Sequence, residues 1–283
     1  MKQEYVTHLY FNYMPQFLAL YMSLNRNVTN FRLWVVCLDE KVQAALSSFD
    51  ERVRTILFDE RAPAEVLATK TTRSIGEYCW TVTPFLADLV FDCSDAEHIT
   101  YIDCDCWFAR NPMLIFDEFF SSGKSCLISK HAYHPDYDQS ITSGVYCVQF
   151  IIFDRVKSRP IRDQWSAQCL QWCYNRVEDG KFGDQKYLES WPYQFSREVH
   201  VLADESRIMG PWSAKRFPYS DADIWHFHGL RLKFENEEVK VNINSHYELP
   251  SPTFEAIYQP YIRDINNAVL MLKMANQPIS AQV

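Results

Sequence analysis

Residues 4–38 read EYVTHLYFNYMPQFLALYMSLNRNVTNFRLWVVCL, and this stretch decides the fold class. Its two ends, 4–11 and 33–38, are rich in β-branched and aromatic residues, which favour strands. Between them, apolar residues recur at helical spacing from Met14 to Leu24, and Pro15 suits the first turn of a helix. A strand–helix–strand unit is typical of a mostly parallel sheet covered by helices, so the sequence predicts an α/β fold.

The rest of the chain continues this alternation. Further strands are predicted at 53–58, 98–103, 125–130, 145–153, 197–202 and 224–230. Further helices are predicted at 40–48, 77–92 (despite Pro84), 159–177 and 254–274. No repeat or linker divides the chain, so we expect one domain over 1–250 and a C-terminal helical extension over 251–283. The helix of the extension is expected to pack on its own domain, with a dimer or membrane-surface helix as the alternative.

Composition excludes several classes of protein. The 28 basic and 36 acidic residues give a formal net charge of -8, which lacks the basic surface that a nucleic acid requires. With only 7 glycines in 283 residues, a glycine-rich phosphate loop is not expected. The 9 cysteines include no pair of C-x-x-C motifs, which argues against structural zinc and for reduced thiols. Without a signal-like start or an apolar run of about 18 residues, we expect a cytoplasmic protein with at most peripheral membrane contact.

Two carboxylates, Asp103 and Asp105, stand at the end of the predicted strand 98–103. Alternate residues of an extended backbone point the same way, so both side chains can face one point beyond the strand. Open α/β sheets bind ligands at this edge. A hard divalent cation, with substrate phosphates completing its coordination, would relieve the repulsion between the two acids. The alternative is a solvated acidic turn.

A second polar segment, WHFHGLRLK at 225–233, adds imidazole and positive charge. His226 or His228 could bind a transition ion such as Mn²⁺, and Arg231 or Lys233 could neutralise phosphate. If this segment is considered alone, the alternative is that its histidines have a structural role. Together with the D-x-D pair, the segment predicts a site for a metal and a diphosphate.

These blocks resemble a known family. An apolar strand, D-x-D and a late H-x-x-G followed by a basic residue are the layout of metal-dependent glycosyltransferases with the GT-A fold. The layout is similar to family 8, whose members end in H-x-x-G-x-x-K. Four segments look more closely like bacterial sugar transferases of surface polysaccharide synthesis: EYCWTVTPFL (77–86), ITYIDCDCWFARNP (99–112), GVYCVQFIIF (144–153) and EDGKFGDQKYLESWP (178–192). The resemblance covers roughly 4–233 and implies a Rossmann-like, mostly parallel sheet flanked by helices.

By position, the resemblance assigns the metal and the donor diphosphate to four residues. Asp103 and Asp105 match the D-x-D pair that binds the metal and the donor. His226 matches the metal-binding histidine of the family, and Gly229 matches the glycine that contacts the diphosphate.

The final cation departs from the family 8 pattern. Lys233 stands one residue later than the family's lysine and Arg231 one residue earlier, so which of them meets the diphosphate stays open. His228 lies on the same strand face as His226 and is the alternative metal ligand.

Two further residues match positions near the transferred sugar. Asp184, within the G-D-Q segment at 183–185, could bind sugar hydroxyls, act as a general base or face a developing oxocarbenium ion. Its alternative role is to cap a helix over KYLESW. Gln149 lies in the region where related enzymes approach the anomeric carbon, with a core glutamine on an apolar strand as the alternative.

Two further sets of residues are candidates for binding the nucleotide and the acceptor only by their place in the chain. Residues at the end of the first predicted strand are candidates for binding the nucleotide: Thr7, Asn12 and Tyr13. Tryptophans near the polar segments of the second half are candidates for stacking on acceptor sugars, with a core position as the alternative: Trp172, Trp191 and Trp212.

The resemblance implies a hexosyl- or glycosyltransferase (EC 2.4 class) with a UDP-sugar donor and Mn²⁺ or Mg²⁺ as cofactor. The acceptor is expected to be a glycan or a lipid-linked sugar at the inner face of the membrane, and retention is slightly favoured. A homodimer is one expectation for its assembly. The alternative is a non-catalytic protein that binds glycans or nucleotide-sugars, against which the intact D-x-D pair and His226 argue.

Overall fold

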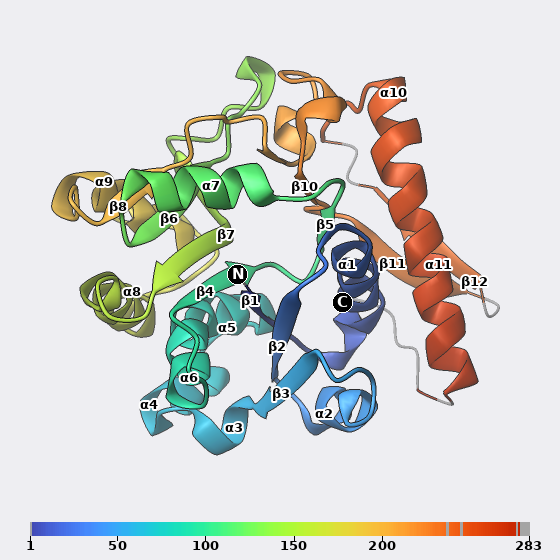
Figure 1. The fold of residues 1–283 in the computed structure, drawn as a ribbon, viewed down its shortest axis with the longest axis horizontal. Coiled ribbons are helices and arrows are strands. Elements are labelled where there is room, and N and C mark those ends of the chain that lie inside the picture. Colours follow the sequence, from blue (N-terminus) through green and yellow to red (C-terminus); the bar gives the residue numbers. More distant parts are fainter. Residues whose placement is uncertain (1, 236–237, 244–245, 276, 278–283) are drawn as a thin grey trace.

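The centre of the computed structural model, which describes residues 2–235, 238–243, 246–275 and 277, is a seven-stranded sheet. The strand order is β3-β2-β1-β4-β7-β6-β8 (Figure 1). Neighbouring strands are parallel except at β7, which runs antiparallel to β4 and β6. The predicted α/β fold with a mostly parallel sheet is therefore confirmed. Its strands are β1 (Gln3–Leu9), β2 (Phe31–Cys37), β3 (Val53–Leu57), β4 (His98–Ile102), β6 (Cys126–Lys130), β7 (Tyr146–Asp154) and β8 (Val199–Val201).

Two smaller sheets accompany the central one. In the first, β10 pairs antiparallel with β5 and parallel with β9, and in the second, β11 and β12 form an antiparallel hairpin. Their strands are β5 (Cys106–Phe108), β9 (Ile208–Met209), β10 (Ile224–His226), β11 (Arg231–Glu235) and β12 (Glu238–Asn242).

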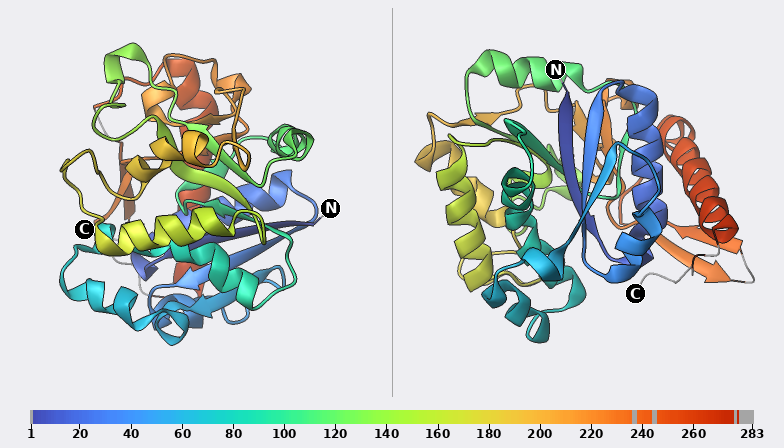
Figure 2. Two further views of the ribbon diagram at one scale, coloured as in Figure 1. Left: turned by 90° about the vertical axis from the view of Figure 1, so that its left-hand side faces the viewer. Right: turned by 60° about the horizontal axis from the view of Figure 1, so that its bottom comes forward.

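Helices cover both faces of the central sheet (Figure 2). On one face, α1, α2, α7 and α11 contribute side chains to the core, and on the other α4, α5, α6, α8 and α9 do. The helices are α1 (Met14–Asn27), α2 (Glu40–Leu46), α3 (Phe58–Arg61), α4 (Ala64–Ala68), α5 (Ile75–Val82), α6 (Leu86–Asp92), α7 (Met113–Ser122), α8 (Arg159–Gln171), α9 (Trp191–Gln194), α10 (Ser251–Thr253) and α11 (Gln259–Met274).

Strand β2 shows why the central strands are apolar almost throughout. Leu33, Val35 and Cys37 pack into the core that contains α1. The alternate residues Trp34 and Val36 pack into the core that contains α5. Because helices cover both faces, each side chain of such a strand is buried whichever way it points.

Several helices differ from their predicted bounds. The helix predicted at 77–92 is two helices, α5 and α6, joined by a 3₁₀ turn over Thr83–Phe85. Pro84 lies in this turn and has no N–H to donate, which interrupts the helical hydrogen bonds. The helix predicted at 159–177 ends at Gln171, since Trp172 is extended. The C-terminal helix has a π-helical turn over Phe254–Tyr258 ahead of α11.

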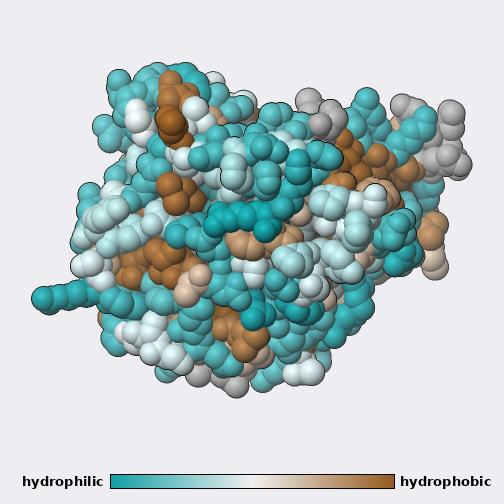
Figure 3. All heavy atoms as spheres, turned by 90° about the horizontal axis from the view of Figure 1, so that it is seen from above, coloured by the Kyte–Doolittle hydropathy of each residue, from teal (hydrophilic) through white to brown (hydrophobic). Residues whose placement is uncertain are grey.

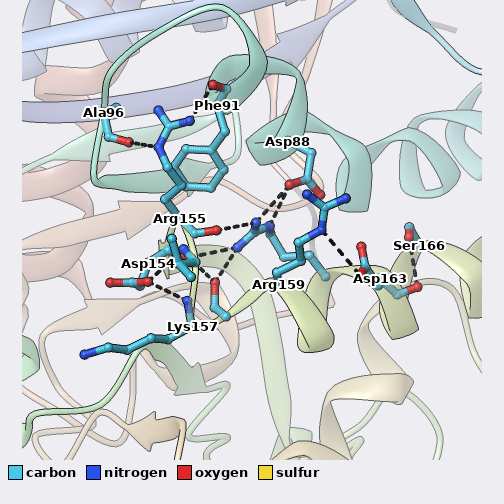
Figure 4. Close-up of polar contacts among 12 residues, drawn as sticks. Asp88, Phe91, Ala96, Asp154, Arg155, Lys157, Arg159, Asp163 and Ser166 are labelled. Atoms are coloured by element: carbon cyan, nitrogen blue, oxygen red, sulfur yellow. Dashed lines mark hydrogen bonds and ion pairs between the residues drawn. The ribbon is translucent and has the colours of Figure 1, made fainter.

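Two arginines, one buried and one half-buried, tie α6 to α8 and to the end of β7 (Figure 4). Arg162 donates to a carboxylate oxygen of Asp88 at 3.0 Å and to the carbonyls of Asp154 and Arg155, each at 2.8 Å. Arg155 in turn donates to the carbonyl of Phe91 at 2.6 Å. These bonds satisfy a guanidinium that would otherwise be costly to bury.

The C-terminal helix α11 is bound to the rest of the domain by both polar and apolar contacts. The carboxylate of Asp264 accepts hydrogen bonds from Trp107 Nε1 at 2.7 Å and from Arg26 Nη1 at 3.1 Å. Ala268 and Leu272 belong to the core that also contains α1 and the sheet. The helix therefore packs on its own domain.

The outer surface carries its apolar residues in small, separate patches on the face that Figure 3 shows. Exposed apolar side chains on α7 include Met113, Leu114 and Phe120. In the described part of the chain, no helix combines the length and the apolar character needed to cross a membrane.

Candidate functional site

Asp103, Asp105 and His226 meet at the carboxyl edge of the central sheet. His226 Nε2 lies 3.2 Å from Asp105 Oδ1 and 3.6 Å from Asp103 Oδ2. Among the described residues, this is the one group of three acidic, cysteine or histidine side chains whose ligand atoms all lie within 4.8 Å of one another. We call these three residues the triad.

Strand pairing brings the triad together from distant parts of the chain. Asp103 follows β4 directly, and Asp105 precedes β5. Strand β10 pairs with β5 so that His226 lies opposite Cys106, and the N–H of Phe227 donates to the carbonyl of Asp105 at 3.0 Å. The middle strand of this small sheet, β10, therefore brings the histidine to the acids.

The charges of the triad compensate one another. Burial raises the pKa of Asp103, and the charge of His226 offsets only part of this rise. Burial also tends to raise the pKa of Asp105, but the positive His226 outweighs it and holds this pKa below its usual value. For His226, burial tends to lower the pKa, yet Asp105 raises it well above the ordinary value. In the absence of a metal, a protonated His226 is thus the cation that balances the acids.

Gln149 lies against His226 rather than at an open surface. It is fully buried on β7, and its Oε1 lies 2.9 Å from His226 Nδ1. A core position was the alternative predicted for this residue, and burial agrees with it. The contact with an imidazole of the triad was not foreseen, because it depends on how β7 pairs with β4.

Asp184 is buried close to the triad. Burial and the charge of Asp103 raise the pKa of its carboxyl well above the ordinary value. The side chain does not cap the following 3₁₀ helix, Gln185–Ser190, so the alternative role predicted for it is wrong. Its neighbour Gly183 has φ +52, and a Cβ there would lie 3.3 Å from Cε3 of Trp80. Sequence reasoning did not include Trp80 among the site residues, although its ring packs closely against the segment that contains Asp184.

The loop after β10 places Arg231 toward the acids. Gly229 adopts φ +75, which favours glycine, in the turn between β10 and β11. Arg231, at the start of β11, lowers the pKa of Asp105 by its charge. Lys233 lies two residues further along the hairpin, opposite Lys240.

His228 lies beside the triad without joining it, and it is exposed to solvent. Its ring centroid lies 5.8 Å from that of His226. Partial desolvation of the ring and the charge of His226 lower its pKa to about 4.

The three nucleotide candidates of the first strand lie at its carboxyl end. Thr7 is buried within β1, and Asn12 and Tyr13 lie in the 3₁₀ turn Phe11–Tyr13. Burial raises the pKa of Tyr13, and the charge of Asp105 adds to this rise.

The three candidate tryptophans occupy different environments. Trp191 is fully buried, with its ring centroid 5.4 Å from that of Trp165, so its predicted stacking on a sugar is wrong and its alternative, a core position, is correct. The ring of Trp172 is buried, with the cations of Arg176 and Lys181 at 5.7 and 5.1 Å from its centroid. A buried ring does not present an open surface for stacking on a sugar.

Trp212 alone of the three lies beside the triad. Its ring centroid is 5.5 Å from that of His226, and its Nε1 donates to the carbonyl of His131 at 2.7 Å. The ring is nevertheless buried, and Tyr247 packs with it. Sequence reasoning missed His131, which directly follows β6 and so lies at the same edge of the sheet as Asp103.

Comparison with known sequences identifies two relatives in Bacillus subtilis (strain 168). YfnD is 28% identical over 280 residues, which cover 92% of this chain and 86% of YfnD. YfnF is 27% identical over 271 residues, which cover 88% of this chain and 89% of YfnF. No family model matches the chain.

Solved structures similar to this one are glycosyltransferases. Mouse xyloside xylosyltransferase 1 matches with a TM-score of 0.51 and 16% identity, over 81% of this chain and 98% of that one. The galactosyltransferase LgtC, in complex with donor and acceptor sugar analogs, matches with 0.52 and 16%, over 80% and 87%. The bifunctional glycosyltransferase WbbM matches with 0.56 and 14%, over 99% of this chain and 52% of WbbM. The fold is that of GT-A glycosyltransferases.

Proposed function

We propose that the chain is a metal-dependent glycosyltransferase that uses a UDP-sugar donor. The observation that carries this proposal is the triad, two carboxylates and an imidazole at the carboxyl edge of a GT-A sheet. The resemblance to family 8 and to bacterial surface-polysaccharide transferases supports a glycan or a lipid-linked sugar as acceptor. A lipid-linked acceptor would bring the protein to the inner face of the membrane.

The triad fits a divalent cation such as Mn²⁺ or Mg²⁺. Carboxylate oxygens suit hard cations, and one imidazole nitrogen favours a transition ion, so the donor set favours Mn²⁺. The ligands would be Asp103, Asp105 and His226, and the proton that His226 holds would be displaced. When bound, such an ion stabilises the negative charge of a departing nucleoside diphosphate.

The neighbouring residues have distinct tasks in this proposal. Arg231 would add a second positive charge to the diphosphate, and the turn at Gly229 would let the backbone approach it. Asp184, a buried carboxyl with a raised pKa, can donate as well as accept hydrogen bonds and would bind hydroxyls of the transferred sugar. Tyr13 would contact the nucleotide from the end of β1.

The experiment that tests the proposal is a panel of nucleotide-sugars incubated with the protein and Mn²⁺. We expect release of UDP from one or more UDP-sugars, and loss of that release in the variant Asp103→Asn. Silence across all UDP-sugars, or an Asp103→Asn variant as active as the wild type, would refute the proposal. Binding of UDP with Mn²⁺ but without turnover in the presence of glycan acceptors would favour a non-catalytic binding protein.

A further inference from the structure

Gln149 contacts two members of the triad, Asp103 and His226. Its backbone carbonyl accepts the N–H of Asp103 at 3.1 Å, and its side-chain Oε1 lies 2.9 Å from His226 Nδ1. The residue is fully buried on β7, where the antiparallel register with β4 sets Phe150 opposite Ile102. One residue thus contacts a carboxylate ligand through its main chain and the histidine through its side chain.

The contact with Gln149 determines which nitrogen of His226 is available to a cation. His226 Nε2 faces the carboxylates, so a metal held there needs the lone pair of Nε2 and the proton on Nδ1. An amide oxygen can only accept a hydrogen bond, so Gln149 Oε1 stabilises the form that carries a proton on Nδ1. With the amide oriented as it is, Oε1 toward the ring, the opposite tautomer would place two lone pairs against each other across 2.9 Å.

The environment of Gln149 argues against a role as a filler of the core. Its Nε2 is buried and has no hydrogen-bond partner in the protein, so its side-chain contact with His226 is what offsets the burial of the amide. An apolar side chain of the same length would avoid that cost. The polar group is therefore explained by His226 and not by packing.

We propose that Gln149 is a positioning residue that holds His226 with its Nε2 lone pair directed to the metal. This inference rests on the proposed function, because it presupposes that the triad binds a cation. It assigns Gln149 to the histidine and replaces the expectation that this side chain approaches the anomeric carbon. Partners of this kind commonly change metal affinity by about 10- to 100-fold when they are removed.

The test measures Mn²⁺ affinity by calorimetry in the wild type and in two variants of Gln149. Gln149→Met keeps the length of the side chain and removes the acceptor, and we expect binding about 10- to 100-fold weaker. Gln149→Glu keeps an acceptor for Nδ1, and we expect binding at least as tight as in the wild type. The visible spectrum of the Co²⁺-loaded protein gives a second readout, and we expect it to change in Gln149→Met and to persist in Gln149→Glu.

Gln16 offers a matched control. It is also a buried glutamine, on α1, and neither end of its amide has a hydrogen-bond partner. Gln16→Met should leave Mn²⁺ affinity unchanged. Thermal unfolding in EDTA checks that each variant is folded. If Gln149→Met does not fold, Gln149→Asn, whose amide is one methylene short of Nδ1, should show the same loss.

The outcomes separate this inference from the proposed function. Mn²⁺ binding by folded Gln149→Met as tight as that of the wild type overturns the positioning role and leaves the proposed function intact. An equal loss in Gln16→Met also overturns it, since the effect would then be one of core polarity. A wild type that binds no Mn²⁺ overturns both.

Discussion

The triad shows at the scale of single residues how charge selects a ligand. Two acids that are 3.2 and 3.6 Å from one imidazole nitrogen bind either a proton or a cation between them. Burial by itself lowers the pKa of His226, but the negative charges of Asp105 and Asp103 outweigh it and raise this pKa well above its ordinary value. The same arrangement makes proton and metal competitors for one place.

This competition predicts that Mn²⁺ affinity increases with pH. His226 and Asp103 both have raised pKa values, so the metal-free protein must release protons when the metal binds. Below the pKa of His226, each pH unit should tighten binding by up to about tenfold for each proton released. Calorimetric titration from pH 6 to 8.5, in roughly one-unit steps, measures this dependence. A profile that does not change with pH would contradict a protonated His226.

A second prediction distinguishes Arg231 from Lys233 as the residue that binds the diphosphate. Arg231 influences Asp105, whereas Lys233 lies further along β11, so Arg231→Gln should weaken UDP binding in the presence of Mn²⁺ more than Lys233→Gln does. We expect a loss of about tenfold for Arg231→Gln, the size of one charge-assisted hydrogen bond, and little change for Lys233→Gln. Equilibrium binding of UDP measures both variants, and the reverse ranking would assign the diphosphate to Lys233.

At the scale of the elements, turns hold the buried side chains at the edge of the sheet. Gly183 turns the chain into the segment that contains Asp184, and its Cα lies against the ring of Trp80 on α5. The position favours glycine for two reasons, its left-handed conformation and the tight contact that a Cβ would make with the ring. Gly180, in the same loop, has φ +72 but open space around it.

This pair of glycines provides a matched test of close packing. Gly180→Ala should lose about 1 kcal/mol of unfolding free energy, because a left-handed conformation is unfavourable for alanine. Gly183→Ala should lose more, since its Cβ would approach Cε3 of Trp80 to 3.3 Å and displace either the ring or Asp184. Denaturation with urea measures both losses. Equal losses of unfolding free energy in the two variants would show that the Trp80 ring moves aside at little cost.

At the scale of the whole molecule, the C-terminal helix is part of the domain core. Asp264 on α11 accepts hydrogen bonds from Arg26 on α1 and from Trp107 on β5. These contacts join α1 and α11 to β5, the strand that follows the D-x-D pair. We therefore propose that the described part of the C-terminal extension, through α11, unfolds together with the rest of the domain.

The contacts of Asp264 with α1 and β5 should contribute to the stability of the whole molecule. Asp264→Ala should lower the free energy of unfolding by about 2 kcal/mol, because it removes hydrogen bonds from a buried carboxylate. Asp163→Ala, which breaks an exposed pair with Arg159 four residues away on α8, should cost no more than about 0.5 kcal/mol. Urea unfolding measures both, and a single transition in the wild type is expected. Similar losses in the two variants would contradict an integral role for α11.

Local rules predicted much of the fold and the main candidate residues. Alternation along 98–103 placed Asp103 and Asp105 beyond a strand, and the strand–helix–strand pattern of 4–38 predicted the parallel sheet. Both predictions rest on patterns among residues that are close together in the sequence. Pro84 was misjudged, since its missing N–H divided a helix that apolar spacing alone had predicted as continuous.

The sequence by itself determined the fold class and the candidate ligands, because periodicity and residue chemistry are properties of short stretches of chain. The tertiary structure alone decided that Gln149 meets His226, that Trp191 lies in the core and that the charge of Arg231 adds to that of His226 at Asp105. Each of these contacts joins strands or loops far apart in sequence. Their distances follow from strand register and helix packing, which depend on the whole chain at once.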